Sequence, residues 1–206
     1  MADAVTARRS SEAAGRPRDP ALDRAVLTAA AELLGEHGYR ALTMDAVASR
    51  AGTTKPAIYR RWPGKTALIV EVLAARLPAP MPPGSGDPGA DVIEAGRRLA
   101  DSLADPAVRH GMTGLLAEAA GDPSITLQIR EKLVRPHLDA AETAVAQAHA
   151  TGLIPAWLTA DLIADVVTGT VLQRVLIRGE TPDPAFFESI ARLLLAGMTE
   201  GDGSAR

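Results

Sequence analysis

Five cationic side chains and no carboxylate lie within the segment from Ala46 to Ile69. The cations are Arg50, Lys55, Arg60, Arg61 and Lys65. Tyr59 and Trp62 stand among them, in a chain that holds only six aromatic residues. Guanidinium, ammonium and phenol groups donate hydrogen bonds to phosphate oxygens, and Arg and Lys also reach the acceptors of guanine. The segment therefore indicates a surface that contacts nucleic acid.

The charge of the whole chain supports this interpretation. The 206 residues carry a formal net charge of −3, but residues 1–76 hold twelve Lys or Arg against eight Asp or Glu. Residues 77–206 hold ten against seventeen, so a basic front precedes an acidic rear. A basic region of this kind is suited to a polyanionic partner.

Composition excludes several other classes of protein. With no cysteine, the chain has no disulfide, thiolate metal site or thiol nucleophile, and we expect no metal and no cofactor. Catalytic motifs such as H-E-x-x-H, G-x-S-x-G and a Gly-rich phosphate loop are absent, so we expect no enzyme. No apolar run approaches the ~20 residues that span a bilayer, and the N-terminus lacks an apolar signal core. We therefore expect a cytoplasmic protein without a membrane partner.

The Ala- and Leu-rich composition predicts an all-α fold. Four Asp-Pro pairs mark expected helix starts, because Asp is a good N-cap and Pro suits the first helical position. They lie at residues 19–20, 105–106, 122–123 and 183–184. The predicted helices are 20–36, 43–50, 55–61, 65–77, 91–104, 106–120, 123–150, 159–178 and 184–199, with a kink or break at Pro136.

Two short helices joined at Gly52 form a helix-turn-helix, whose second helix can enter the major groove. The residues "AAAELLGEHGYRALTMDAVASRAGTTKPAIYRRWPGKTAL" (29–68) closely resemble the DNA-binding domain of TetR-family transcriptional regulators. Departures are modest: Pro56 stands where the family often has Gly, and Trp62 where it usually has Phe. The resemblance implies an N-terminal three-helix DNA-binding domain and a C-terminal helical bundle for dimerisation and ligand binding.

The expected organisation follows from this likeness. Residues 1–18 form a basic arm, 19–77 the helix-turn-helix domain with a linking fourth helix, 78–90 a Pro/Gly-rich loop, 91–200 the rear domain and 201–206 a tail. The resemblance makes Lys55, Ala57 and Arg60 the candidate base readers. Thr43, Thr54, Tyr59, Arg61 and Lys65 become candidate phosphate contacts. Arg16 and Arg18, around Pro17, could lie in a minor groove, or the arm could be an ordinary tail.

Two wide apolar bands in the rear half predict a homodimer interface. The residues expected there are Leu162, Val166, Gly169, Thr170, Phe187, Ile190 and Leu194. An effector pocket is implied by the family alone. Its candidate lining residues are Leu103, His110, Met112, Leu115, Leu116, Leu127, Gln128 and His137, and the small-molecule effector is unidentified.

The expected function is a repressor that a small-molecule effector releases from palindromic double-stranded DNA. The fourth helix would tilt when the ligand binds and so change the separation of the two recognition helices. A helix-turn-helix regulator without a ligand, constitutive or controlled by a partner, is the alternative that the residues leave open.

Overall fold

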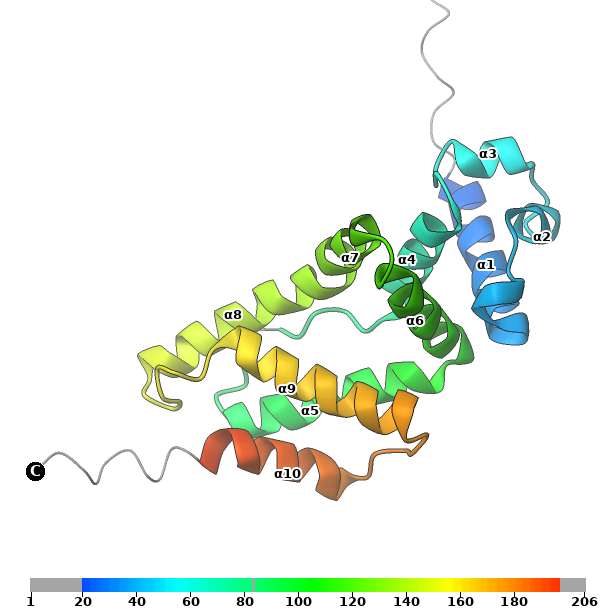
Figure 1. Ribbon diagram of the computed structural model, residues 1–206. Helices are drawn as coiled ribbons and strands as arrows, with labels where there is room; N and C mark the ends of the chain where they lie inside the picture. The colour runs from blue at the N-terminus through cyan, green and yellow to red at the C-terminus, as the bar shows by residue number, and fades with distance from the viewer. Residues whose placement is uncertain (1–19, 83, 197–206) are drawn as a thin grey trace, which may run out of the picture.

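The computed structural model describes residues 20–82 and 84–196, and these residues form helices and connecting loops without a strand (Figure 1). The predicted all-α fold is therefore confirmed for this part of the chain. Arg16 and Arg18 of the expected minor-groove arm lie outside the described residues. In the described part, no helix combines the length and the apolarity needed to cross a membrane.

The described part of the chain forms ten α-helices and two π-helical segments. The front helices are α1 Pro20–Ala41, α2 Met44–Arg50, α3 Lys55–Tyr59 and α4 Lys65–Arg76. The rear helices are α5 Pro88–Ala104, α6 Pro106–Ala119, α7 Pro123–Ile129, α8 Arg135–Ala150, α9 Ala160–Leu172 and α10 Pro184–Leu195. The π-helical segments are η1 Arg130–Val134, between α7 and α8, and η2 Gln173–Ile177, after α9.

Three of the predicted Asp-Pro pairs start rear helices, and Asp19 of the fourth lies outside the described residues. The carboxylates of Asp105, Asp122 and Asp183 accept hydrogen bonds from backbone N–H groups of the first turns of α6, α7 and α10. A further pair, Asp87-Pro88, starts α5 in the same way, with the Asp87 carboxylate accepting from the N–H groups of residues 89 and 90. The expected loop 78–90 is therefore too long, because its last three residues, 88–90, belong to α5.

Two residues interrupt helices where their chemistry requires it. Gly38 takes φ 76° and ψ 173° within α1, a left-handed φ that glycine adopts at low cost. Pro136 lacks an N–H, so the long predicted helix 123–150 cannot keep its regular bonding there. The chain forms η1 instead, in which the Arg135 N–H donates to the carbonyl of Arg130, and a separate α8 follows.

The largest hydrophobic cluster joins the front helices to the rear ones. It includes Leu34, Ile69 and Leu73 of the front, and Leu103 and Leu115 of the rear, all of them fully buried. Helix α6 lies across α1 and α4, which places the rear bundle directly on the front domain (Figure 1). A second cluster lies among α5, α9, α10 and the loop before α9.

Candidate nucleic-acid interface

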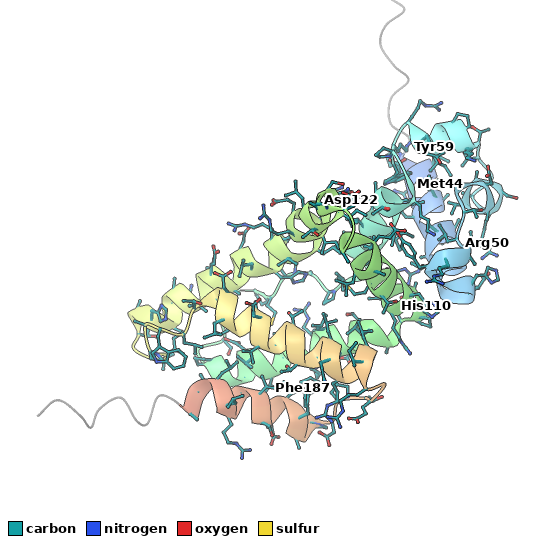
Figure 2. All side chains as sticks on the ribbon, viewed as in Figure 1. Met44, Arg50, Tyr59, His110, Asp122 and Phe187 are labelled. Atoms are coloured by element: carbon teal, nitrogen blue, oxygen red, sulfur yellow. The ribbon has the colours of Figure 1, made fainter. Side chains whose placement is uncertain are left out.

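Helix α3 divides its residues between the core and the surface. Ile58 is fully buried and Trp62, four residues later, is 7% exposed, so this side faces the core as expected for helical periodicity. Lys55, Tyr59 and Arg60 are exposed on the other side. Figure 2 shows Tyr59 on the front domain, at the end of the molecule away from the rear bundle.

The two threonines expected at helix N-termini behave differently. Thr43 caps α2, because its hydroxyl oxygen accepts a hydrogen bond from the Ala46 N–H at 3.2 Å. Thr54 occupies the N-cap position of α3 with extended backbone, but its side chain makes no capping hydrogen bond. Thr54 therefore stands at the N-cap position without making the capping bond that a threonine there favours. Its exposed hydroxyl remains available to an external acceptor.

Ion pairs fix the short helices to one another. Lys55 Nζ lies 2.8 Å from Asp45 Oδ2, which joins α3 to α2. This bond raises the pKa of Lys55 above its ordinary value, so the ammonium stays charged. Arg50 Nη1 lies 2.7 Å from Glu36 Oε1, which joins α2 to α1. These exposed ion pairs link the three helices at the surface, while the buried Ile58 and Trp62 fix α3 on the core.

Two of the expected DNA contacts are turned away from the surface. Ala57 is only 7% exposed, so its methyl group does not protrude as a base reader requires. The Arg61 side chain is 16% exposed and its guanidinium pairs with Asp23 of α1. This salt bridge ties the end of α3 to the first helix. We therefore withdraw Ala57 and Arg61 from the contact set.

Lys65 lies where the front helices α1 and α4 meet the rear helix α6. Its Nζ is 4.2 Å from the centre of the Tyr39 ring, in a cation–π contact. Burial lowers the pKa of Lys65, and the nearby carboxylate of Glu118 opposes this change. Since the ring covers only one side of the ammonium, Lys65 stays in the predicted phosphate set.

Polar contacts tie α4 to the rear helices at its start, middle and end. Thr66 donates to Glu118 Oε2 of α6 at 2.9 Å. Glu71 pairs with Lys132 of η1. Arg76 Nη1 lies 2.6 Å from Asp105 Oδ2, the carboxylate that also caps α6. The linking helix is therefore attached along its whole length, a relation that the sequence did not predict.

The expected effector-pocket residues do not gather around one cavity. Leu103 and Leu115 are fully buried and Met112 is 9% exposed, so all three belong to the core. His110 Nδ1 lies 2.9 Å from the carbonyl oxygen of Leu34 and so connects α6 to α1. In contrast, Leu116 and Leu127 are 45% and 51% exposed, while Gln128 and His137 are half-buried.

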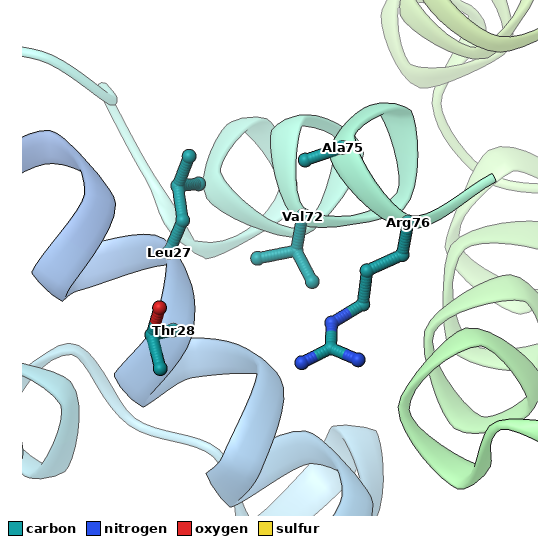
Figure 3. A pocket seen from close by; sticks show the side chains of 5 residues that line it. All are labelled: Leu27, Thr28, Val72, Ala75 and Arg76. Carbon is teal, nitrogen blue, oxygen red and sulfur yellow. The ribbon is translucent and has the colours of Figure 1, made fainter. Parts of the chain in front are cut away.

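Two surface pockets lie elsewhere. One, of about 290 Å³, is lined by Leu27 and Thr28 of α1 and by Val72, Ala75 and Arg76 of α4 (Figure 3). The other, of about 310 Å³, lies where the segment before α5 meets the end of α8. Neither contains a residue from the predicted set.

The expected dimer residues separate by helix. On α9, Leu162 is 39% exposed, and a Cβ built on Gly169 would meet no atom within 4 Å. Val166 and Thr170 are half-buried. On α10, the expected face is wrong: Phe187, Ile190 and Leu194 are 5–6% exposed and pack inside their own subunit. Leu193, on the neighbouring side of α10, is 72% exposed.

Comparison with known families agrees with this architecture. Residues 26–72 match the family model described as bacterial regulatory proteins, tetR family. Residues 82–194 match the model described as tetracyclin repressor-like, C-terminal domain. Together the two models cover the front helices and nearly all of the rear helices.

Individual proteins resemble the chain over most of its length. The uncharacterised HTH-type transcriptional regulator YdeS of Bacillus subtilis (strain 168) is 26% identical over 187 residues, covering 89% of this chain and 93% of that protein. The similarly named Rv1556 of Mycobacterium tuberculosis is 26% identical over 211 residues, covering 98% and 100%. The crystal structure of the TetR family transcription regulator SCO0332 aligns with a TM-score of 0.68 at 28% identity, covering 85% and 97%.

Proposed function

Because the chain belongs to the TetR family of bacterial transcriptional regulators, we propose that it represses transcription from a palindromic operator and releases this DNA when a small-molecule effector binds the rear helices. Membership of the family also confirms that the chain is a DNA-binding regulator and not an enzyme. The operator, the effector and the direction of regulation are the parts that we propose.

The exposed side of α3 is the observation that carries the proposal. It presents Lys55, Tyr59 and Arg60 together, with Thr54 at the start of the helix. Among the described residues, the Arg60 side chain has no hydrogen-bond or ion-pair partner, so its guanidinium is free to bond to guanine N7 and O6. The Tyr59 hydroxyl and the Thr54 hydroxyl suit phosphate oxygens on either side.

A homodimer supplies the second recognition helix that a palindrome needs. Half-sites are read one helical turn apart, about 34–36 Å, by two equivalent helices. The open surface at Gly169, the exposed Leu162 and the exposed Leu193 support α9 and α10 as the pairing faces. Gly169 would let a helix of the second copy approach closely.

The attachment of α4 supports coupling between effector and DNA. Its contacts with Glu118, Lys132 and Asp105 mean that a shift of α6 or η1 would carry α4 with it. Helix α4 follows α3 in the chain, so a tilt of α4 would move α3, the recognition helix. A coupling free energy of about 1–3 kcal/mol is typical and would change DNA affinity about 5- to 150-fold.

The test is binding of the purified protein to DNA upstream of its own gene, measured across a salt series. We expect Lys55→Ala and Tyr59→Ala to weaken binding to the palindromic site. Arg97→Ala is the matched control, because Arg97 is an exposed arginine on α5, which lies far from α3 in Figure 1. The slope of log K against log salt should be about −0.9 per phosphate contact.

The outcomes separate clearly. Palindrome-specific binding that is lost in both α3 variants and kept in the control supports the proposal. The other outcome is weak binding that does not depend on DNA sequence and is equal in the wild type and all three variants. That result would show that the α3 surface is only a basic patch, and it would refute the proposal of a specific operator.

A further inference from the structure

The second of the two surface pockets lies in the rear bundle, at the end of the molecule remote from α3, where α5 begins and α8 ends (Figure 1). Its volume is about 310 Å³. The lining residues are Gly84, Gly86, Pro88, Asp91, Ala144, Gln147, Ala148, Thr151 and Leu153. Sites for small molecules are mostly apolar hollows of about 300–1,000 Å³, in which a few polar groups orient the ligand. This pocket has the composition of such a site and a volume suited to a small ligand.

Gly84 lies between a carboxylate of α5 and a methyl group of α8. A Cβ built on Gly84 would be 3.0 Å from Asp91 Oδ2 and 3.4 Å from the Cβ of Ala144. The Asp91 carboxylate and α8 therefore border the same small space, which a side chain at residue 84 would occupy.

Asp91 has no cationic partner within residues 20–82 and 84–196. Its two oxygens share one hydrogen bond from the Ser85 N–H, at 3.2 Å and 3.1 Å. A carboxylate has about four lone-pair positions, so this bond leaves acceptor capacity unused. Asp91 is half-buried, and no Lys, Arg or His lines the pocket. A cation from outside the chain would offset the hydration that the carboxylate has lost.

The other polar groups of the pocket also present acceptors. The Thr151 hydroxyl donates its one proton to the carbonyl oxygens of Gln147 and Ala148, at 3.0 Å and 3.2 Å. A donor in the pocket would therefore meet the lone pairs of this hydroxyl. The Gln147 side-chain amide has no partner among the described residues, so its oxygen is free to accept as well. The pocket thus suits a cationic hydrogen-bond donor.

The apolar lining indicates which kind of cation fits. No aromatic residue lines the pocket, so it lacks the ring faces that bind quaternary ammonium groups through cation–π contacts. An ammonium group with N–H bonds finds acceptors here instead. Pro88, Ala148 and Leu153 offer apolar surface for a hydrocarbon body, and Leu153 is 38% exposed without a ligand. Covering such surface stabilises a complex.

We propose that this pocket binds a small primary amine as its ammonium ion, which donates to the Asp91 carboxylate and the Thr151 hydroxyl while its hydrocarbon body lies against Leu153. The inference deepens the proposed function and rests on it, since it gives the effector a chemical class. Hydrogen bonds between an ammonium group and a carboxylate are about twice as strong as those between neutral groups. Charge and N–H bonds should therefore both be needed for tight binding.

The experiment is calorimetric titration of the full-length protein with butylamine, hexylamine and benzylamine at neutral pH. Each amine is compared with the alcohol of the same skeleton, which lacks the charge. It is also compared with the corresponding trimethylammonium ion, which keeps the charge but has no N–H bond. We expect at least one amine to bind about tenfold or more tightly than both of its analogues, as a charge-assisted hydrogen bond predicts.

Two variants test the assignment of the residues. Asp91→Asn keeps an oxygen that can accept from the Ser85 N–H but removes the charge, so the preference for the amine should be lost. Gly84→Ala leaves Asp91 in place and puts a methyl group 3.0 Å from its Oδ2, so it should also abolish amine binding. Gly84→Ala decides the matter if Asp91→Asn fails to fold. Asp101→Asn is the control, because Asp101 is an exposed carboxylate of the same helix outside the pocket lining, and this variant should bind the amine as the wild type does.

General attraction of cations to the acidic rear half would give a different pattern. It would bind the trimethylammonium ion as tightly as the amine, and Asp101→Asn would reduce binding as much as Asp91→Asn does. Either result refutes the site. An amine that binds no more tightly than its alcohol, or that Gly84→Ala binds as the wild type does, refutes it as well.

Operator binding without any amine separates this inference from the proposed function. A wild type that binds its palindrome but prefers no amine refutes the amine site and leaves the regulator intact. A wild type that binds an amine through Asp91 but shows no sequence-specific DNA binding refutes the operator and keeps the site.

Discussion

Gly114 of α6 lies directly against the ring of Tyr39, so closely that a Cβ at position 114 would collide with the ring atoms. Tyr39 is 8% exposed and carries Lys65 over its face. The absence of a side chain on one rear residue thus allows the last turn of α1 and the first turn of α4 to rest on α6. The stability of the contact that α1 and α4 make with α6 should therefore depend on the absence of a methyl group at position 114.

Gly114→Ala should lower the free energy of unfolding by about 1–3 kcal/mol, the usual cost of overpacking. Urea denaturation measures this change. In the double variant with Tyr39→Ala, the added methyl group should cost less, because the ring that it strikes is gone. Gly121→Ala is the control, since the nearest atom to its Cβ would be the carbonyl oxygen of Glu118 at 3.7 Å. If Gly114→Ala were as stable as the wild type, α6 and the Tyr39 ring would be able to move apart at little cost in free energy.

We expect Tyr39 to lose its proton at a higher pH than an ordinary tyrosine, and the free energy of unfolding to decrease in alkali. Burial, with a smaller contribution from Glu118, raises its pKa from 10.0 to about 12. Below pH 10 the phenol is protonated in both states, so its contribution to stability is complete. As the pH rises from about 10 towards 12, the unfolded chain loses this proton first and stability decreases.

Ultraviolet absorbance of Tyr59→Phe isolates Tyr39, because the chain has two tyrosines. We expect the phenolate signal of the folded protein near pH 12, and near the ordinary value once urea has unfolded it. An ordinary value in the folded state would show that the Tyr39 hydroxyl is open to water.

Asp45→Asn should tighten DNA binding. Asp45 is exposed and holds Lys55 at 2.8 Å, so its charge competes with phosphate for the ammonium. Removing that charge should raise operator affinity about two- to fivefold, the scale of an exposed ion pair, and steepen the salt slope. Fluorescence anisotropy with labelled operator gives both quantities. Glu94→Gln, another paired carboxylate but on α5, should leave affinity unchanged; weaker binding by Asp45→Asn would instead mean that the pair must orient Lys55.

Leu193→Asp should separate the dimer without unfolding the subunit. Leu193 is 72% exposed, so a carboxylate there stays hydrated in a monomer but would be buried between two copies. We expect the dissociation constant to rise at least about a hundredfold, as measured by sedimentation velocity. Val134→Asp, at an apolar position of η1 that is 45% exposed, is the comparison. A dimer that survives Leu193→Asp would place the interface away from this side of α10.

Local signals predicted several helix starts well. Thr43 and the Asp-Pro pairs act within three residues of themselves, so their capping is written in the neighbouring sequence. Arg61 was misassigned because its partner, Asp23, is distant in the chain. Its cationic neighbours gave no sign that one guanidinium would turn inward.

The sequence did not determine which surface each side of a helix contacts. Phe187, Ile190 and Leu194 form a correct apolar stripe, yet a stripe does not say whether its own subunit or a second copy covers it. The burial of Arg98 was missed for the same reason. In the sequence it looks like Arg97, yet Arg98 is half-buried and Arg97 is exposed.

The contact of Gly111 with the front helices bears on how such regulators can be recombined. A Cβ at Gly111 would lie 2.9 Å from Leu73, 3.1 Å from Leu34 and 3.4 Å from Ile69, so α6 fits the front helices without spare room. Consider a chimera that joins the rear helices of this chain, from residue 78 onward, to the front helices of another regulator. In such a chimera α6 would pack against front helices whose side chains do not fit it. Exchange between paralogues should therefore succeed where α6 travels with α1 and α4, which makes the evolutionary module larger than the helix-turn-helix.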